Sequence, residues 1–239
     1  MTEKKSDKFK SILKYSGSVY LAQVLNIFSI FIIPNFLTPV LLGKFNLLQT
    51  FYNYMDYSHF GVRFGLDKQI PTLIAKKQLS KADYIANTGL IGIFLVTILI
   101  DFIAFTGMFF VSGLDKDFFF GIFIIFIAAT FYSLFNCQKI VLRAHEEISK
   151  MSVITLVYGL IWSVLRLTGV IFYGFYGLLF GILLSNIISV IIMTRFTNQK
   201  NHLRFNFKIF KTLLITGFPF FVYGILTVIF RSLDRILIA

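Results

Sequence analysis

The 239-residue sequence has very little cysteine, histidine, tryptophan or charge. Its single cysteine, Cys137, excludes an internal disulfide, and three scattered histidines make a metal site unexpected. The triplet HEE at 145–147 lacks the second histidine of a zinc protease. Charged residues make up 14% of the chain, whereas soluble domains carry about 25%. No long polar segment remains for a soluble catalytic domain, so neither an enzyme nor a cofactor is expected.

Apolar residues are abundant instead, at 57% of the chain with a mean hydropathy of +0.80. They lie in blocks close to the ~20 residues that cross a bilayer core. The sequence therefore predicts an all-α, polytopic transmembrane bundle. The first block is followed by further spans, which favours a retained helix over a cleaved signal peptide. Six complete spans are predicted at 17–37, 41–63, 86–111, 118–140, 153–173 and 176–194, with a seventh starting near Leu213.

The net charge of +12 would suggest a nucleic-acid partner in a soluble protein, but the placement of the basic residues argues otherwise. If the N-terminus is cytoplasmic, 18 of the 23 Lys and Arg residues lie on the cytoplasmic side or at that interface. Only Lys44 and Lys116 then lie outside, and three arginines lie within spans. This asymmetry follows the positive-inside rule and predicts the orientation of the chain.

A stripe of polar residues runs along the predicted second span. If residues 45–63 form one helix, spacings of three and four place the polar side chains on one face. Such a face must contact protein or a water-filled cavity, because lipid cannot satisfy it. Gly61 and Gly65 would let a neighbouring helix approach closely. An alternative stays open for Arg63, Asp67 and Lys68: they belong to an amphipathic helix at the inner membrane surface and have no role in a cavity. The stripe consists of Asn46, Gln49, Tyr52 with Asn53, Asp56, His59 and Arg63.

Other charges are predicted deep in the membrane, where each alone costs about 2.5–3.5 kcal/mol. Asp101 and Arg166 lie at similar depths in the third and fifth spans, which predicts a mutual ion pair. Arg231, Asp234 and Arg235 cluster in the seventh span. Asp234 can neutralise only one of the two arginines there, so one positive charge remains for an anion or for lipid headgroups.

Three segments resemble parts of the Wzx-type polysaccharide flippases. DYSHFGVRFGLDKQIPTLIAKKQ (56–78) is similar to their second helix and following loop, with its glycines, basic residue and IP step. KYSGSVYLAQVLNIFSIFIIPNFLTPVLLGKFNL (14–47) resembles their first helix, and GFPFFVYGILTVIFRSLDRILIA (217–239) their seventh. The resemblance implies the multidrug/oligosaccharidyl-lipid/polysaccharide exporter (MOP) superfamily, whose two six-helix lobes enclose a central cavity. We expect residues 1–212 to form the N-terminal lobe and 213–239 to begin a truncated second lobe.

The resemblance implies a flippase in a bacterial cytoplasmic membrane. It would move an undecaprenyl-diphosphate-linked oligosaccharide between leaflets, with membrane lipids and other polysaccharide assembly proteins as candidate partners and no nucleic acid. Arginine suits such a diphosphate through its fork of donors. The candidate substrate-binding residues are Gln49, Tyr52, Asn53, Asp56, Arg63, Arg166, Arg231 and Arg235, and Asp101 and Asp234 are candidates for ion coupling or structural pairing.

Two alternatives stay open at this point. A drug or cation antiporter of the same superfamily would use Asp56 or Asp101 as its ion site, and the excess of intramembrane arginine argues weakly against it. A membrane polysaccharide polymerase or glycosyltransferase would need acids and bases on its outer loops, where the sequence offers only Asp115 and Asp117.

Overall fold

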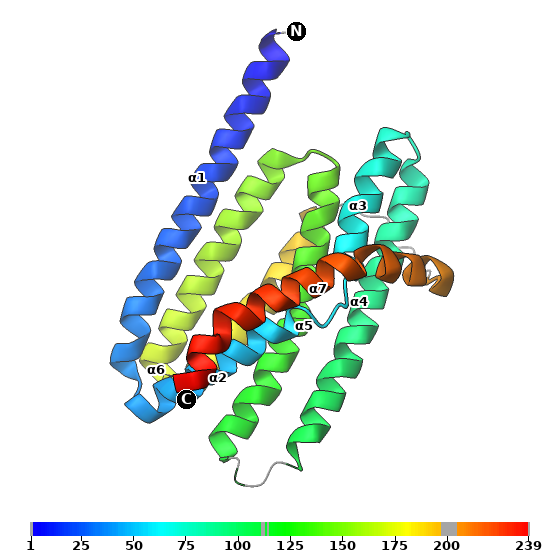
Figure 1. Ribbon diagram of the computed structural model, residues 1–239. Helices are drawn as coiled ribbons and strands as arrows, with labels where there is room; N and C mark the ends of the chain where they lie inside the picture. Colours follow the sequence, from blue (N-terminus) through cyan, green and yellow to red (C-terminus); the bar gives the residue numbers. More distant parts are fainter. Residues whose placement is uncertain (1, 111–112, 114, 197–204, 239) are drawn as a thin grey trace.

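The computed structural model describes the backbone of residues 2–110, 113, 115–196 and 205–238, and the side chains of 13–110, 113, 115–196 and 205–230. Within these residues the fold is entirely helical (Figure 1). The elements are α1 (Thr2–Ile32), the 3-10 helix η1 (Ile33–Phe36), α2 (Pro39–Met55), α3 (Val62–Ala75), α4 (Leu79–Met108), α5 (Lys116–Ala144), α6 (Ile148–Phe196) and α7 (Phe207–Ile238).

Five stretches of the described residues are long and apolar enough to cross a membrane. The chain runs back and forth between two ends of the bundle (Figure 1). The start of α1, the α3–α4 connection and the α5–α6 connection lie together at one end, which we call the N-terminal end. The multi-pass helical bundle expected from the sequence is therefore present. The five stretches are Leu13–Phe36, Leu79–Met108, Lys116–Ala144, Ile148–Phe196 and Phe207–Phe230.

The predicted second span is not one helix. Helix α2 ends at Met55, residues 56–61 form turns, and α3 begins at Val62. Phe60 and Gly61 both have positive φ, of 46° and 91°, a conformation that a helix cannot contain. The predictions of six complete spans and of one continuous polar stripe over 45–63 are therefore not confirmed, because the break turns α3 away from the axis of α2.

Helix α6 is a hairpin rather than a single rod. A straight helix of its 49 residues would be about 74 Å long, more than twice the bilayer core. At Gly174, φ is 59° and ψ is −137°, and the chain reverses. Gly169 then lies against Gly177, and Gly181 against Leu165, which is antiparallel packing. The reversal falls between the predicted fifth and sixth spans.

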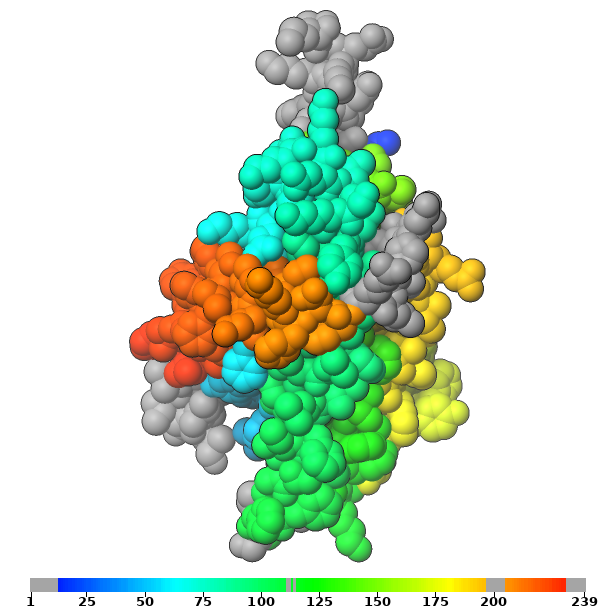
Figure 2. Space-filling model, turned by 90° about the vertical axis from the view of Figure 1, so that its right-hand side faces the viewer, coloured from blue at the N-terminus to red at the C-terminus, as the bar shows by residue number. Residues whose placement is uncertain are grey.

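Helix α7 crosses α3 and the middle of α4 obliquely (Figures 1 and 2). The contact with α3 is made by backbone on both sides. A Cβ at Gly61 would lie 2.6 Å from the carbonyl carbon of Gly217, and a Cβ at Gly65 would meet the carbonyl oxygen of Leu213. The expectation that Gly61 and Gly65 admit a close neighbour is confirmed, and that neighbour is α7.

The apolar core lies where α2, α5 and the two arms of α6 meet. Leu48, Ile125, Leu178 and Leu179 are fully buried there. Large apolar side chains such as Phe102 and Phe172 are exposed on the outside, at 65% and 75%. An apolar exterior around a packed interior is what a lipid environment requires.

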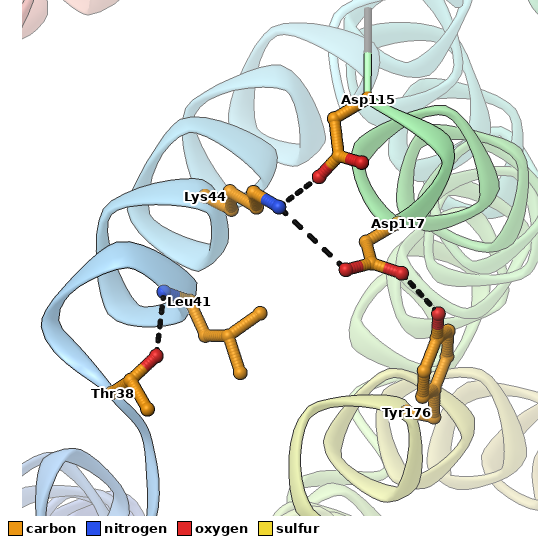
Figure 3. Close-up of polar contacts among 6 residues, drawn as sticks. All are labelled: Thr38, Leu41, Lys44, Asp115, Asp117 and Tyr176. Atoms are coloured by element: carbon orange, nitrogen blue, oxygen red, sulfur yellow. Dashed lines mark hydrogen bonds and ion pairs between the residues drawn. The ribbon is translucent and has the colours of Figure 1, made fainter.

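A polar cluster ties three helices together at the end opposite the N-terminal end (Figure 3). Lys44 of α2 donates a hydrogen bond to Asp115 and lies 3.6 Å from Asp117, which accepts a hydrogen bond from the hydroxyl of Tyr176. The bond from Lys44 holds the pKa of the Asp115 carboxyl below its usual range. Three of the charges that the sequence places in the outer loops, Lys44, Asp115 and Asp117, therefore lie in one cluster.

The glycine contact between α3 and α7 yields the first testable prediction. Gly65→Ala should destabilise the protein by about 1–3 kcal/mol, because the added methyl group meets the backbone of α7, which can shift only as a helix. The melting temperature of the purified chain in detergent measures this. Gly107→Ala in α4 is the matched control, since a Cβ there has no neighbour within 4 Å. Equal melting temperatures for the two variants would contradict the packing.

Candidate functional site

A cavity of about 910 Å³ lies between α1, α2 and α6. Its polar lining is Asn26, Asn46, Gln49, Thr50 and Arg166, and Phe45 and Trp162 contribute aromatic walls. We call it the Arg166 pocket. Among the described residues that line it, Arg166 carries the only charge. The pocket is therefore electropositive and rich in neutral hydrogen-bonding groups.

Arg166 is held by neutral partners. Its side chain is 5% exposed and lies over the Trp162 ring, with 4.9 Å between the guanidinium carbon and the ring centroid. One terminal nitrogen donates to Asn26 Oδ1 at 3.4 Å, and Nε is buried without a hydrogen-bond partner. Stacking on a tryptophan face stabilises a guanidinium by about 0.5–2 kcal/mol, less than the cost of burying it without an anion. The site thus holds a positive charge that is only partly compensated.

Four aromatic rings form a closed cluster next to this pocket, and one of them, Trp162, also lines it. Tyr52, Tyr132, Tyr158 and Trp162 come from α2, α5 and α6, and each ring lies against two others of the set. The centroid distances around the cluster are 5.5, 6.3, 5.9 and 6.1 Å. The Tyr52 hydroxyl is 3.4 Å from Oδ1 of the buried Asn186. We call these four residues the aromatic cluster.

The polar stripe predicted on α2 divides among three environments. Gln49 lines the Arg166 pocket together with Asn46, and Tyr52 is buried in the aromatic cluster. Asn53 is exposed and lines neither that pocket nor the smaller one beside Asp56. Because α2 stops at Met55, the residues beyond it follow a different axis.

Asp56 and Arg63 bind each other across the break between α2 and α3. Both terminal nitrogens of Arg63 donate to the two carboxylate oxygens of Asp56, at 2.7 and 3.2 Å. A paired guanidinium has little net charge for a phosphate. This ion pair bridges the break, in which Phe60 and Gly61 have positive φ. His59 is fully buried there, and its Nδ1 accepts a hydrogen bond from the Gly61 amide at 3.0 Å.

The predicted ion pair between Asp101 and Arg166 is wrong. Asp101 accepts a hydrogen bond from Thr130 of α5, whereas Arg166 contacts Asn26 and Trp162. The two residues do not meet, because α5 packs against both α4 and α6, the helices that carry them. Asp101 lines neither pocket. The side chains of Arg231, Asp234 and Arg235 lie outside the described residues.

Several residues of the site were not predicted. Trp162 precedes Arg166 by one helical turn, and a lone tryptophan four residues from a deep arginine is a usable signal for cation–π stacking. Tyr158 precedes Trp162 by one further turn on the same face of α6, so the same spacing signal extends to it. Asn26 and Tyr132 carry no such signal, because they join the site only through the packing of α1 and α5 on α6.

No protein-family model and no curated protein matches this sequence. Solved structures match it over most of its length. The fold is that of MATE transporters of the MOP superfamily. An outward-facing multidrug resistance MATE family transporter has a TM-score of 0.74 at 15% identity, over 91% of this chain and 53% of that chain. A MOP superfamily transporter from Pyrococcus furiosus, with a binding pocket of reverse polarity, has a TM-score of 0.73 at 15% identity and the same coverage.

A MATE structure in complex with Br-NRF has a TM-score of 0.71 at 16% identity, over 92% of this chain and 55% of that chain. The chain thus spans a little more than half the length of each of these transporters. Structural similarity at this level of identity establishes the fold alone. The neighbours are transporters rather than enzymes.

The second testable prediction concerns access to the Arg166 pocket. Gln49→Cys should react with a small, water-soluble methanethiosulfonate reagent, because Gln49 is half-buried and lines the cavity. Leu48→Cys should react far more slowly, because Leu48 is fully buried in the apolar core and does not line the cavity. The native Cys137, 0% exposed, is an internal unreactive control. Equal labelling rates at positions 48 and 49, measured by mass spectrometry, would contradict a water-filled pocket.

Proposed function

We propose that the chain is part of a membrane transporter whose Arg166 pocket binds the headgroup of an anionic, lipid-linked oligosaccharide. The observation that carries the proposal is the charge of the pocket. Arg166 is buried there without a carboxylate partner, and no acidic residue occurs among the described residues of the lining. A diphosphate would supply the missing anion, and the guanidinium could bind it through two parallel hydrogen bonds.

The rest of the lining suits a sugar attached to that diphosphate. Asn26, Asn46 and Gln49 offer amide donors and acceptors for hydroxyl groups. Trp162 offers a flat apolar face at the same site. A volume of about 910 Å³ lies at the upper end of the range for small-molecule pockets, which fits a diphosphate with a few sugar rings. The resemblance to polysaccharide flippases supports an undecaprenyl-diphosphate carrier and movement between leaflets without covalent chemistry.

The fold supports a multidrug or cation antiporter equally well, so the charge of the pocket is what distinguishes an antiporter from a transporter of anionic lipids. A cationic drug needs an acidic or π-rich site free of competing positive charge. Asp56 is neutralised by Arg63, and Asp101 bonds to Thr130 away from both pockets. The neighbour from Pyrococcus furiosus shows that pocket polarity can vary within the superfamily, where reversed polarity suggests a different function. The positive pocket here favours an anion.

Equilibrium binding to the full chain in zwitterionic nanodiscs provides the test. Farnesyl diphosphate should bind saturably. Farnesol should only partition into the lipid, without saturable binding to the protein, and the organic cation ethidium should not bind. Arg166→Gln should weaken diphosphate binding about 10- to 100-fold, the ~1.5–3 kcal/mol of a hydrogen bond to a charged group. Arg166→Lys should recover part of the loss, because it keeps the charge but not the fork.

Arg195→Gln is the matched control, since Arg195 is exposed at the end of α6. It should leave binding unchanged. Melting temperatures recorded for every variant separate loss of the site from loss of the fold. Binding of ethidium in preference to farnesyl diphosphate would contradict the proposal and favour the antiporter.

A further inference from the structure

A second, smaller cavity of about 300 Å³ adjoins Tyr132 on the other side of the aromatic cluster, and its lining residues Arg143 and Met151 flank the α5–α6 connection. Its lining includes charged side chains from α3 and α5 and a tyrosine, Tyr15, from α1. We call it the Lys139 pocket. Met151 of α6 lines this pocket. It precedes Arg166 by 15 residues, which corresponds to about 22 Å along the helix. Its charged lining residues are Asp56, Arg63, Asp67, Lys139 and Arg143.

The ion pairs of this pocket leave one cation without an acidic partner. Arg63 is bound bidentately by Asp56, and Arg143 donates to Asp67 at 2.5 Å. Lys139 forms no ion pair with any described residue, and its ammonium lies 5.5 Å from the centroid of the Phe135 ring. The side chain is half-buried. Three cations against two carboxylates leave a net charge of +1, which is located at Lys139.

Three residues with neutral hydrogen-bond donors line the pocket together with this cation. The hydroxyls of Tyr15 and Tyr132 and the amide of Asn136 line the same cavity. A phosphate group accepts hydrogen bonds from hydroxyl and amide donors and is attracted by an ammonium as a point charge. The pocket therefore has the chemistry of a phosphate site, with donors from α1 and α5.

The two pockets adjoin the same aromatic cluster from opposite sides. Tyr132 lines the Lys139 pocket, Trp162 lines the Arg166 pocket, and both rings contact Tyr52 and Tyr158. Phe135, beneath Lys139, stacks on Tyr158 with 4.7 Å between the ring centroids. Each cation thus lies over an aromatic ring that is in contact with the cluster. The arrangement places two positive sites at two depths, separated by a layer of rings.

We infer that the Lys139 pocket is a second phosphate site, which binds the diphosphate headgroup of the lipid substrate on the opposite side of the aromatic cluster from Arg166. The inference rests on the proposed function for the identity of the lipid, and on Lys139 and its neutral donors for the phosphate chemistry. The Asp56–Arg63 pair then has a structural role, because it holds the α2–α3 break beside the pocket without neutralising Lys139.

Binding stoichiometry in phosphatidylcholine nanodiscs tests this inference. The wild-type chain should bind two molecules of radiolabelled farnesyl diphosphate. Lys139→Gln should bind one, Arg166→Gln should bind one, and the double variant none. Lys139→Arg should still bind two. Lys76→Gln is the matched control, because Lys76 is an exposed lysine at the same end of the bundle and lines neither pocket.

The outcomes separate the two proposals. Unchanged stoichiometry in Lys139→Gln, with one molecule lost in Arg166→Gln, would overturn the second site and leave the proposed function intact. One molecule lost in Lys139→Gln and none in Arg166→Gln would support the second site and overturn the role of the Arg166 pocket.

A measurement on the wild-type chain avoids dependence on the folding of a variant. Farnesyl diphosphate should protect Lys139 from acetylation by a water-soluble N-hydroxysuccinimide ester and leave Lys76 reactive, as read by mass spectrometry. Inorganic pyrophosphate at the same concentration should protect less, because it lacks the lipid tail. Equal protection by phosphatidylglycerol in the nanodisc would assign the pocket to an ordinary lipid headgroup and overturn its assignment to the substrate.

Discussion

An arginine buried in a membrane bundle without a carboxylate is the constraint on which this account depends. Arg166 is 5% exposed, and its only described partners are an asparagine and aromatic rings. A charge in that position is costly unless an anion or a wet cavity compensates it. The cavity of about 910 Å³ beside it has space for such an anion. The charge and the cavity together make this pocket the candidate site.

The break between α2 and α3 determines how the polar residues of the second span are used. A continuous helix over 45–63 would have aligned Gln49, Asp56 and Arg63 on one wall of one cavity. With the break, Gln49 contacts the Arg166 pocket, while Asp56 and Arg63 pair beside the Lys139 pocket. Helix α7 supports the break from outside, because Gly217 packs on Gly61. A local backbone feature, bridged by one ion pair and packed against one crossing helix, thus separates the two pockets.

The sequence predicts the helical class and the reversal at Gly174, because long apolar blocks and the short connections between them are local signals. It also predicts Gln49 and Arg166 as site residues, and both line the pocket. It fails at the α2–α3 break, where polar residues recur at helical spacing from 46 to 63 although α2 ends at Met55, and Phe60 and Gly61 have positive φ. It fails again at Asp101, since equal depth on two helices does not determine which helix lies between them. Lys139 is recognisable only once its neighbours are seen to be paired with others.

The fluorescence of Trp162 gives the most direct test of the central claim. It is the only tryptophan in the sequence, and it lies 4.9 Å from Arg166 in the wall of the proposed site. An anion that draws the guanidinium off the indole face should change its emission. The account predicts a saturable change when farnesyl diphosphate is titrated into nanodiscs carrying the wild-type chain, and no saturable change with farnesol. The same response to both compounds, or none to a diphosphate that demonstrably binds the chain, would contradict an anion site at Arg166.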